Sequence, residues 1–541
     1  MIENAAQTAY KDVSDPCAVY NSLKPLWTKN RVICNGEQAV KDYDSFCDTR
    51  TFSNLLLPFS ASMDQTQYNF FKSEAELPGI TAQFARMLVG ALLRKEPTLK
   101  LPEGTPPEVT DWILDEFGQD DNTLLSFLDN LLWEEIQTNR TWIKVDYPAI
   151  EHPELLSKAD SDRIKPYPVV LKAESVINWH VGQNSMAKNQ LEMLIERGYQ
   201  EVYDNSQYRF HPRIVEVVTV HALDEQGYYY TEKWAAKSQT ATLPVSSGQQ
   251  LINYKRDRQT FELIEVNENI LMNGERLRFI PIWPVNGCIE PEAPLLNTLV
   301  SKEIHLYNKI SRRNHLLYGA STYTPYVSGN GITEEVLEEI ANAGLGSWLR
   351  VPDGATIEIL KTPTEALADM DRAISAAIEE MAKLGVRMLS PETAQSGVAL
   401  TLRNASQTAQ LGSMNNRISS TMRSVIAFMI NWRYGQEFQA SDVTFTMSDD
   451  FNVSPLGAEW VRMATEWYQQ YLIPRSAWLN TLKANDMLPA GYDDNVGRME
   501  IAADQMLAMQ MMQDPSTLAA MMAGDEGGTP GVDEEGITPK E

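Results

Sequence analysis

The sequence predicts an α+β protein that is mainly helical. Two observations predict this class: long segments in which apolar residues recur every three or four positions, and a middle region in which apolar and polar residues alternate. The first period belongs to a helix with one buried face, and the second to a half-buried strand. Hydrophobic content of 43% and charged content of 22% are ordinary for folded protein. Because 541 residues exceed what one hydrophobic core usually serves, we expect several domains or one elongated multi-part body.

The first hundred residues are rich in aromatic side chains and have a mostly helical pattern. One helix is predicted from Ile80 onward, and Pro97 is expected to end it because the residue before a proline avoids the helical conformation. A short helix is predicted after Thr105. A third helix is predicted to start at Asn122, whose side chain is a good N-cap, and to carry apolar residues as far as Ile136.

Alternating residues begin near residue 139 and predict a region of strands. Strands are predicted at residues 139–148, 167–171, 176–179, 214–220 and 228–230. The sequence Glu225-Gln226-Gly227 is typical of a turn, so the last two strands should form an antiparallel hairpin. The Ser/Thr-rich stretch 239–250 predicts an exposed loop at a sheet edge.

The segment from Pro291 to Gly435 contains the strongest helical patterns. A helix is predicted from Leu295 to Tyr318, and a second helix follows Thr362-Pro363-Thr364-Glu365, which combines a capping box with proline at the first helical position. Residues 319–361 between them predict a small α/β insert. A polar stretch, 390–396, separates the second helix from a very long third helix, which Gly435 is expected to end.

The first two of these helices carry opposite charge. The first has basic residues on one face, with Glu303 as the only acid there: Lys302, His305, Lys309, Arg312 and Arg313. The second helix is acidic up to Glu380, and its five acids in that stretch stand against the single base Arg372. These acids are Glu365, Asp369, Asp371, Glu379 and Glu380. Two helices of opposite charge are expected to pack against each other or against neighbours.

The end of the chain returns to helix and then loses its apolar pattern. Two helices are predicted beyond Pro455, with Pro474 between them. Residues 524–541 contain five glycines and six acids against one lysine, so a flexible acidic tail is predicted.

Charge and cysteine content restrict the function. With 46 Lys and Arg against 73 Asp and Glu, the net charge is −27, so any contact with DNA should be loose or local. The cysteines at positions 17, 34, 47 and 288 have no metal-ligand spacing and predict free thiols. The first residues have no basic and apolar leader pattern, and no apolar run approaches the length of a membrane span, so a soluble product of the cytoplasm is expected.

The search for catalytic motifs predicts that the protein is not an enzyme and needs no cofactor or metal. Phosphate-loop, G-x-S-x-G and H-E-x-x-H motifs are absent, and the six histidines are scattered. Gly329-Asn-Gly331 is typical of a turn. The acid pairs Asp449-Asp450 and Asp493-Asp494 are either cation ligands or solvated turn residues, and the second interpretation is favoured because no calcium-loop spacing surrounds them.

Three features in a fixed order carry a family resemblance. The first is Leu92-Leu93-Arg94-Lys95-Glu96-Pro97. The second is Trp142-Ile143-Lys144-Val145-Asp146-Tyr147-Pro148, followed by Lys165-Pro166-Tyr167 and Ala173-Glu174-Ser175-Val176-Ile177-Asn178-Trp179, and the third is the helix, insert, helix, loop and long-helix order of residues 291–435. In this order the chain, except its tail, resembles the portal proteins (head-to-tail connectors) of tailed bacteriophages, of the branch long filed as a domain of unknown function.

The resemblance implies a portal fold with a wing, a stem, a clip and a crown. It implies these parts: wing, 1–290; stem helices, 291–318 and 363–389; clip, 319–362; tunnel loop, 390–396; long wing helix and return strand, 397–453; crown, 454–523; tail, 524–541. It also implies a homo-oligomeric, dodecameric ring at one capsid vertex of the virion, after synthesis in the host cytoplasm. Double-stranded DNA would pass through its channel without sequence specificity.

The implied partners are the terminase large subunit, the major capsid or scaffold protein, and a head-completion or tail adaptor protein, with no membrane. Lys309, Arg312 and Arg313 are then expected to contact Asp369, Glu379 or Glu380 within or between subunits. The tunnel loop is expected to be mobile and non-adhesive because it has one charge and no base: Ser390, Pro391, Glu392, Thr393, Ala394, Gln395 and Ser396. Two alternatives stay open: another virion structural protein, such as an adaptor or capsid-associated protein, and an enzyme with an unrecognised site.

Overall fold

The fold is α+β, as the sequence predicts. The computed structural model describes residues 12–46, 56–57, 63–119, 122–148, 164–182, 190–202, 213–236, 261–321, 324–330, 332–342, 353–360, 365–389, 397–447, 458–470 and 472–484, with a few isolated residues between 488 and 506. The chain forms two compact units, Met1–Phe451 and Asn452–Glu541. The predicted acidic tail, 524–541, and the loop 239–250 lie outside the described residues.

Six helices and one short strand form the described amino-terminal part. They are α2 (Ala18–Cys34), α3 (Glu37–Phe46), α4 (Gln65–Glu74), α5 (Ile80–Leu92), β1 (Thr98–Lys100), α6 (Pro107–Asp115) and α7 (Leu124–Thr138). Helix α5 ends five residues before Pro97 because the chain turns at Leu93 to reach β1, which pairs with a strand far along the chain. The N-cap of α7 is Thr123 and not Asn122: the Thr123 hydroxyl accepts from the Ser126 N–H at 3.2 Å.

Two sheets follow. A three-stranded sheet has the order β11-β2-β3, formed by β2 (Trp142–Asp146), β3 (Tyr167–Leu171) and β11 (Ile282–Pro284). A five-stranded antiparallel sheet consists of β4 (Val176–Val181), β5 (Leu191–Val202), β6 (Arg213–Leu223), β7 (Tyr229–Ala236) and β8 (Phe261–Asn267), in chain order. The predicted hairpin is confirmed as β6 and β7. Between the sheets in sequence, β9 (Leu271–Met272) and β10 (Glu275–Arg276) form a two-stranded hairpin.

The sequence did not predict β5 or β8. In β5, Glu196 is a largely buried acid that accepts from Lys144 at 3.1 Å and lies 3.2 Å from the His221 ring. A charged residue at an inward position breaks the alternation that would have marked the strand. In β8, an edge strand, almost every side chain is exposed, so it has no buried face to create a period of two.

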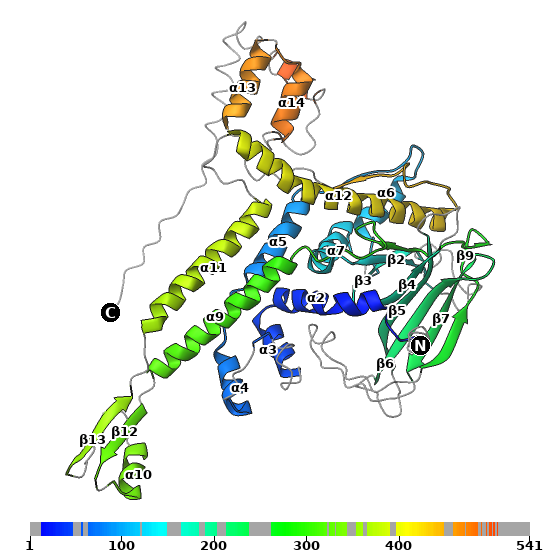
Figure 1. Cartoon of the computed structure of the whole chain (residues 1–541). Coiled ribbons are helices and arrows are strands. Elements are labelled where there is room, and N and C mark those ends of the chain that lie inside the picture. The colour runs from blue at the N-terminus through cyan, green and yellow to red at the C-terminus, as the bar shows by residue number, and fades with distance from the viewer. Residues whose placement is uncertain are drawn as a thin grey trace, which may run out of the picture. The chain divides into compact units, whose positions relative to one another are not determined.

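The central helices begin at α9 (Asn297–Ser321). They continue with β12 (Thr324–Gly329), α10 (Glu334–Asn342), β13 (Ala355–Leu360), α11 (Glu365–Leu389), α12 (Gly397–Tyr434) and β14 (Thr444–Thr446). Figure 1 shows α9 and α11 side by side, with β12, β13 and α10 at one end of the pair. Gly435, which follows α12, has a positive φ of 65° that favours glycine, as expected for a helix stop.

The second unit contains α13 (Ala458–Gln469) and α14 (Arg475–Ala484), with Pro474 between them. The rings of Tyr468 and Trp478 stack at 4.6 Å and hold the two helices together. Asp494 accepts from Arg475 at 2.9 Å and lies 3.1 Å from Arg498. The Asp494 carboxylate is thus held by two arginines, whereas Asp449, Asp450 and Asp493 lie outside the described residues.

Helix α2 joins the helical core to the five-stranded sheet. Its Tyr20 and Trp27 pack with sheet residues such as Ile177 and Val218, and the Tyr20 hydroxyl donates to the Glu174 carbonyl oxygen at 2.9 Å. Further along α2, the buried Arg31 lies 2.6 Å from Glu134 on α7 and 2.9 Å from Glu174 before β4. Burial alone would lower the pKa of Arg31, but the two carboxylates hold it above its usual value. Removing Arg31 would leave the buried Glu174 carboxylate without its basic partner among the described residues.

Glu135 on α7 generates a prediction about pH. Burial raises its pKa to about 7, although the Thr141 backbone N–H, which donates to it at 2.8 Å, opposes the shift. In the unfolded chain this carboxyl titrates near 4.3. Between these values the folded state holds a proton that the unfolded chain has released, so stability is lost as pH rises through this window. In Glu135→Gln this loss should be absent.

We therefore expect the melting temperature of Glu135→Gln, relative to the unmodified protein, to become higher as pH is raised from 5 to 8. Circular dichroism melts across that range measure it. Glu37→Gln is a suitable control, because the pKa of Glu37 is lowered in the fold, so Glu37 stays ionised from pH 5 to 8 and its melting difference should not change over that range. A melting difference for Glu135→Gln that does not change with pH would contradict the assignment.

Candidate functional site

The antiparallel pair α9 and α11 is the part of the described chain with the clearest arrangement of charge. Lys302, near the start of α9, donates to Glu380, near the end of α11, at 2.5 Å. Arg313, near the end of α9, donates to Asp371, near the start of α11, at 2.9 Å. The hydrogen bond and charge of Lys302, with the charge of Lys309, lower the pKa of Glu380.

Apolar residues form the contact between the two helices. Leu306 of α9 and Met381 of α11 are buried in the main core, and Ile310, Ile374 and Leu384 pack partly buried against it. The apolar stripe therefore supplies most of the contact energy, since exposed ion pairs contribute little. The ion pairs fix which residues of the two helices face each other.

The observed pairs differ from the expected ones because of this alignment. With Lys302 against Glu380 and Arg313 against Asp371, Lys309 comes level with Ile374 in an antiparallel pair. Asp369 pairs instead with Arg372, and Glu379 with Lys383 at 2.9 Å, both within α11. The four acids of α11 from Asp369 to Glu380 are therefore all in ion pairs and do not form an unpaired acidic face.

Glu303 corrects the expectation for α9. It is fully buried, away from the basic face, because one residue of helix turns the side chain by about 100° from Lys302. Its carboxylate accepts from the backbone N–H of Ile80 at 2.9 Å and of Thr81 at 2.7 Å, the first residues of α5. Helix α5 has no side-chain cap of its own, since Gly79 precedes it. Glu303 thus caps a helix 223 positions away in sequence.

Three further bases of α9 are exposed. His305, Lys309 and Arg312 follow one line on the helix surface at steps of four and three residues, and all three side chains are exposed. Among the described residues, Lys309 and Arg312 form no ion pair. We call these three residues the α9 basic stripe.

The insert between α9 and α11 is a small α/β element. β12 and β13 pair antiparallel, from Thr324 opposite Leu360 to Gly329 opposite Ala355. A side chain at Gly329 would meet the carbonyl oxygen of Gly354 at 2.5 Å, so glycine is required where the two strands approach. Helix α10, with four glutamates in its sequence EEVLEEIAN, is the helical part of the predicted α/β insert.

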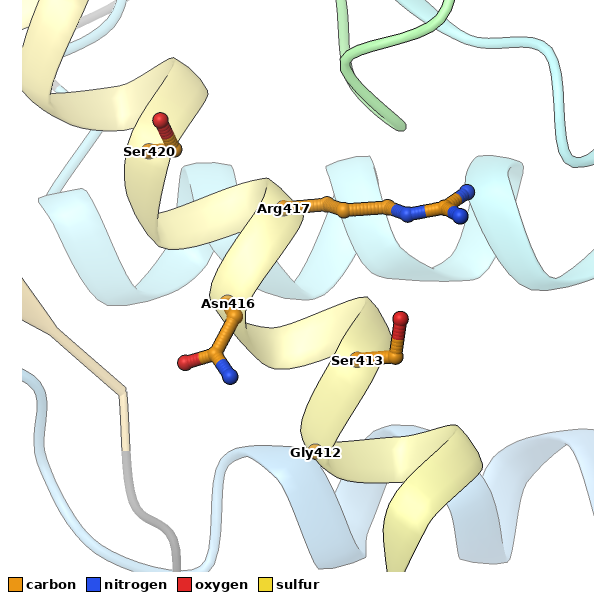
Figure 2. Close-up of a pocket in the computed structure, with 5 residues that line it drawn as sticks. All are labelled: Gly412, Ser413, Asn416, Arg417 and Ser420. Atoms are coloured by element: carbon orange, nitrogen blue, oxygen red, sulfur yellow. The ribbon is translucent and has the colours of Figure 1, made fainter.

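Helix α12 is fixed to the body on one side and open on another. The Thr421 hydroxyl donates to the Pro284 carbonyl oxygen at 3.2 Å, and the Asn415 amide to the Met447 carbonyl oxygen at 3.4 Å. On the open side is a shallow hollow whose lining comes from α12 alone: Gly412, Ser413, Asn416, Arg417 and Ser420. Figure 2 shows these residues on successive turns, with Arg417 extended from the helix. Arg417 donates to Glu292 at 3.1 Å.

A buried polar cluster in the sheets is the strongest candidate for catalysis. Lys144 and His221 both contact Glu196, and the His221 Nδ1 lies 2.7 Å from the Tyr229 hydroxyl. Burial is the main reason that the pKa of His221 is lowered, whereas the hydrogen bond from His221 and the charge of Lys144 lower that of Glu196 to about 2. His221 and Tyr229 are almost fully enclosed, and the contact between Lys144 and Glu196 joins the two sheets.

Within the part of the chain that the structure describes, no group of three or more His, Cys, Asp or Glu is placed to hold a metal ion. None of the described helices is long and apolar enough to span a membrane. The predicted tunnel loop, Ser390, Pro391, Glu392, Thr393, Ala394, Gln395 and Ser396, lies outside the described residues. It connects the end of α11 to the start of α12.

Comparison with known proteins gives one family match. The model described as domain of unknown function DUF4055 matches residues 294–433, from just before α9 to the end of α12. No curated protein matches the chain.

Solved structures also match, at 10% sequence identity and a TM-score of 0.33. One is described as the virion of a native gene transfer agent particle, and the alignment covers 72% of this chain and 84% of the matched chain. Two are described as necks of empty and native particles of that agent, computed with C6 and C12 symmetry, covering 76% of this chain and 90% of theirs. A TM-score of this size does not establish a shared fold.

We predict that Glu303→Gln and Glu303→Ala destabilise the protein by about 2–4 kcal/mol, because either change weakens or removes two charge-assisted hydrogen bonds to buried N–H groups. Thermal or urea unfolding followed by circular dichroism measures the loss. Glu380→Gln, which removes one carboxylate from an exposed pair on the neighbouring helix, is the matched control and should change stability little. Equal effects of the Glu303 and Glu380 changes would contradict the role of the cap.

Proposed function

We propose that this chain is a portal protein, which forms a ring at one capsid vertex of a tailed phage or phage-like particle. Double-stranded DNA would enter and leave through the centre of the ring. The ring would also provide the docking site for the terminase large subunit and later for a head-completion or tail adaptor protein. The protein would act by assembly and positioning and would have no catalytic activity.

The observation that carries the proposal is the order of elements from α9 to α12. Two antiparallel helices enclose a small α/β insert at one end, and a helix of 38 residues follows them. This is the order of stem, clip, stem and long wing helix in portal proteins. The DUF4055 match spans the same elements, residues 294–433, which supports treating them as one unit.

In the proposed assignment, α9 and α11 are the stem and β12, α10 and β13 are the clip. The body before α9, together with α12 and β14, is the wing, and α13 and α14 belong to the crown. Ion pairs at both ends of the α9–α11 contact would keep the stem straight under load, because each pair resists sliding of one helix along the other. The Glu303 cap would connect this stem to the wing.

Two alternatives are distinguishable from the portal by simple measurements. Another virion structural protein would share the absence of catalytic motifs but would not form a large closed ring by itself. An enzyme would show nucleotide hydrolysis or DNA cleavage above background, lost on substitution of one Asp or Glu. The enclosed state of the His221 cluster favours the structural alternatives over the enzyme.

We predict that the purified full chain forms a closed ring with a mass near twelve times that of one chain. When neighbouring copies contact each other through unlike surfaces, they form a closed assembly only if a rotation relates each copy to the next. Size exclusion with light scattering, and mass photometry at lower concentration, measure it. A stable monomer or dimer at micromolar concentration, with and without scaffold protein, would contradict the portal assignment.

A second prediction concerns the loop from Ser390 to Ser396. Replacing Thr393 and Gln395 with lysine should leave ring assembly intact but impair packaging, because lysines on a loop that narrows the channel would be held against the phosphates and slow the moving duplex. The length of packaged DNA in assembled particles measures the effect. The double change to asparagine is a neutral control. Unchanged packaging and ejection in the lysine variant would show that the loop does not face DNA.

A further inference from the structure

The α9 basic stripe contains two exposed cations, Lys309 and Arg312, that form no ion pair among the described residues. In a protein of net charge −27, Lys309 and Arg312 are exposed cations on a helix whose other bases are used: Lys302 contacts Glu380 and Arg313 contacts Asp371. The charge of Lys309 helps to lower the pKa of Glu380, but Glu380 accepts its hydrogen bond from Lys302. Two positive charges per chain are thus left without a carboxylate partner among the described residues.

We propose that the α9 basic stripe is a contact surface for the phosphate backbone of double-stranded DNA. This inference rests on the proposed portal function and assigns one surface of the stem to the DNA. A duplex presents one negative charge per about 1.7 Å of its axis, and exposed Lys and Arg on a rigid helix meet such an array without reading sequence.

The arrangement of the partner helix is the reason to choose DNA over the neighbouring subunit's α11. The described acids of α11 between Asp369 and Glu380 are all paired already, two with α9 and two within α11. A second copy would have to share or break those pairs to accept Lys309 and Arg312. DNA phosphates release counterions on contact and require no such exchange.

The small number of contacts also fits a surface along which DNA slides. Two cations per chain give a weak, salt-sensitive contact, and repetition around a ring distributes it over many equivalent positions. A dense basic patch would hold the duplex in place. The stripe would guide the duplex while the rest of the acidic chain repels it.

Fluorescence anisotropy of a labelled 40-base-pair duplex with the full-length protein, over a series of salt concentrations, tests the inference. Lys309→Gln with Arg312→Gln is compared with Arg372→Gln and Lys383→Gln, which removes the same charge from exposed positions on α11. Each phosphate contact contributes about 0.9 to the slope of log affinity against log salt, so the α9 variant should lose about 1.8 or more from that slope. The α11 variant should keep the slope of the unmodified protein.

The oligomeric mass of every sample is measured alongside the affinity. Equal slopes for the two variants, or no measurable DNA binding by the unmodified protein, would overturn the assignment of the stripe while leaving the ring in place. Loss of the ring in the α9 variant alone would also overturn it, by showing that the stripe contacts another subunit. Failure of the unmodified protein to form a ring would instead reject the portal function, whatever the slopes.

Discussion

The buried carboxylate of Glu303 is the interaction on which the arrangement of the first unit depends. It satisfies two backbone N–H groups at the start of α5, a helix that begins after a glycine and has no cap of its own. Since α9 also pairs with α11, the cap determines where the whole helical pair leaves the body. Burial of an unpaired carboxylate would be costly, so the contact is retained only while α5 and α9 stay together. Burial, and then the charge of Glu303, raise the pKa of the adjacent Cys34 thiol to about 12, which keeps it inert.

In the rest of the first unit, polar pairs determine how neighbouring elements are aligned, and apolar side chains supply most of the stabilising contact. Arg31, Glu134 and Glu174 tie α2 to α7 and to the start of the sheet, while Tyr20 and Trp27 supply the apolar contact. The α9–α11 pair repeats the principle with exposed charges. A part assembled this way keeps its geometry when many copies are brought together, which a ring under mechanical load requires.

Local patterns explain what the sequence predicts well. The helices α9, α11 and α12 and the insert were predicted because each has a period or stop signal within its own residues, such as Gly435 after α12. Features that the sequence does not predict depend on contacts between residues that are far apart in the chain. Glu303 appears to belong to a basic face until α5 is placed beside it, and β5 loses its alternation because Glu196 serves Lys144 and His221. The proposed site is predictable as an order of elements, but which charges remain unpaired depends on how α9 and α11 are aligned.

The central claim is that α9–α11 pairs from many copies surround one channel. Electron microscopy of the purified full-length protein tests it most directly, because class averages report symmetry and a central opening together. The account predicts closed rings with rotational symmetry, in which density for the paired helices surrounds the opening. Particles of one or two chains without an opening, at the micromolar concentrations used for grids, would contradict it.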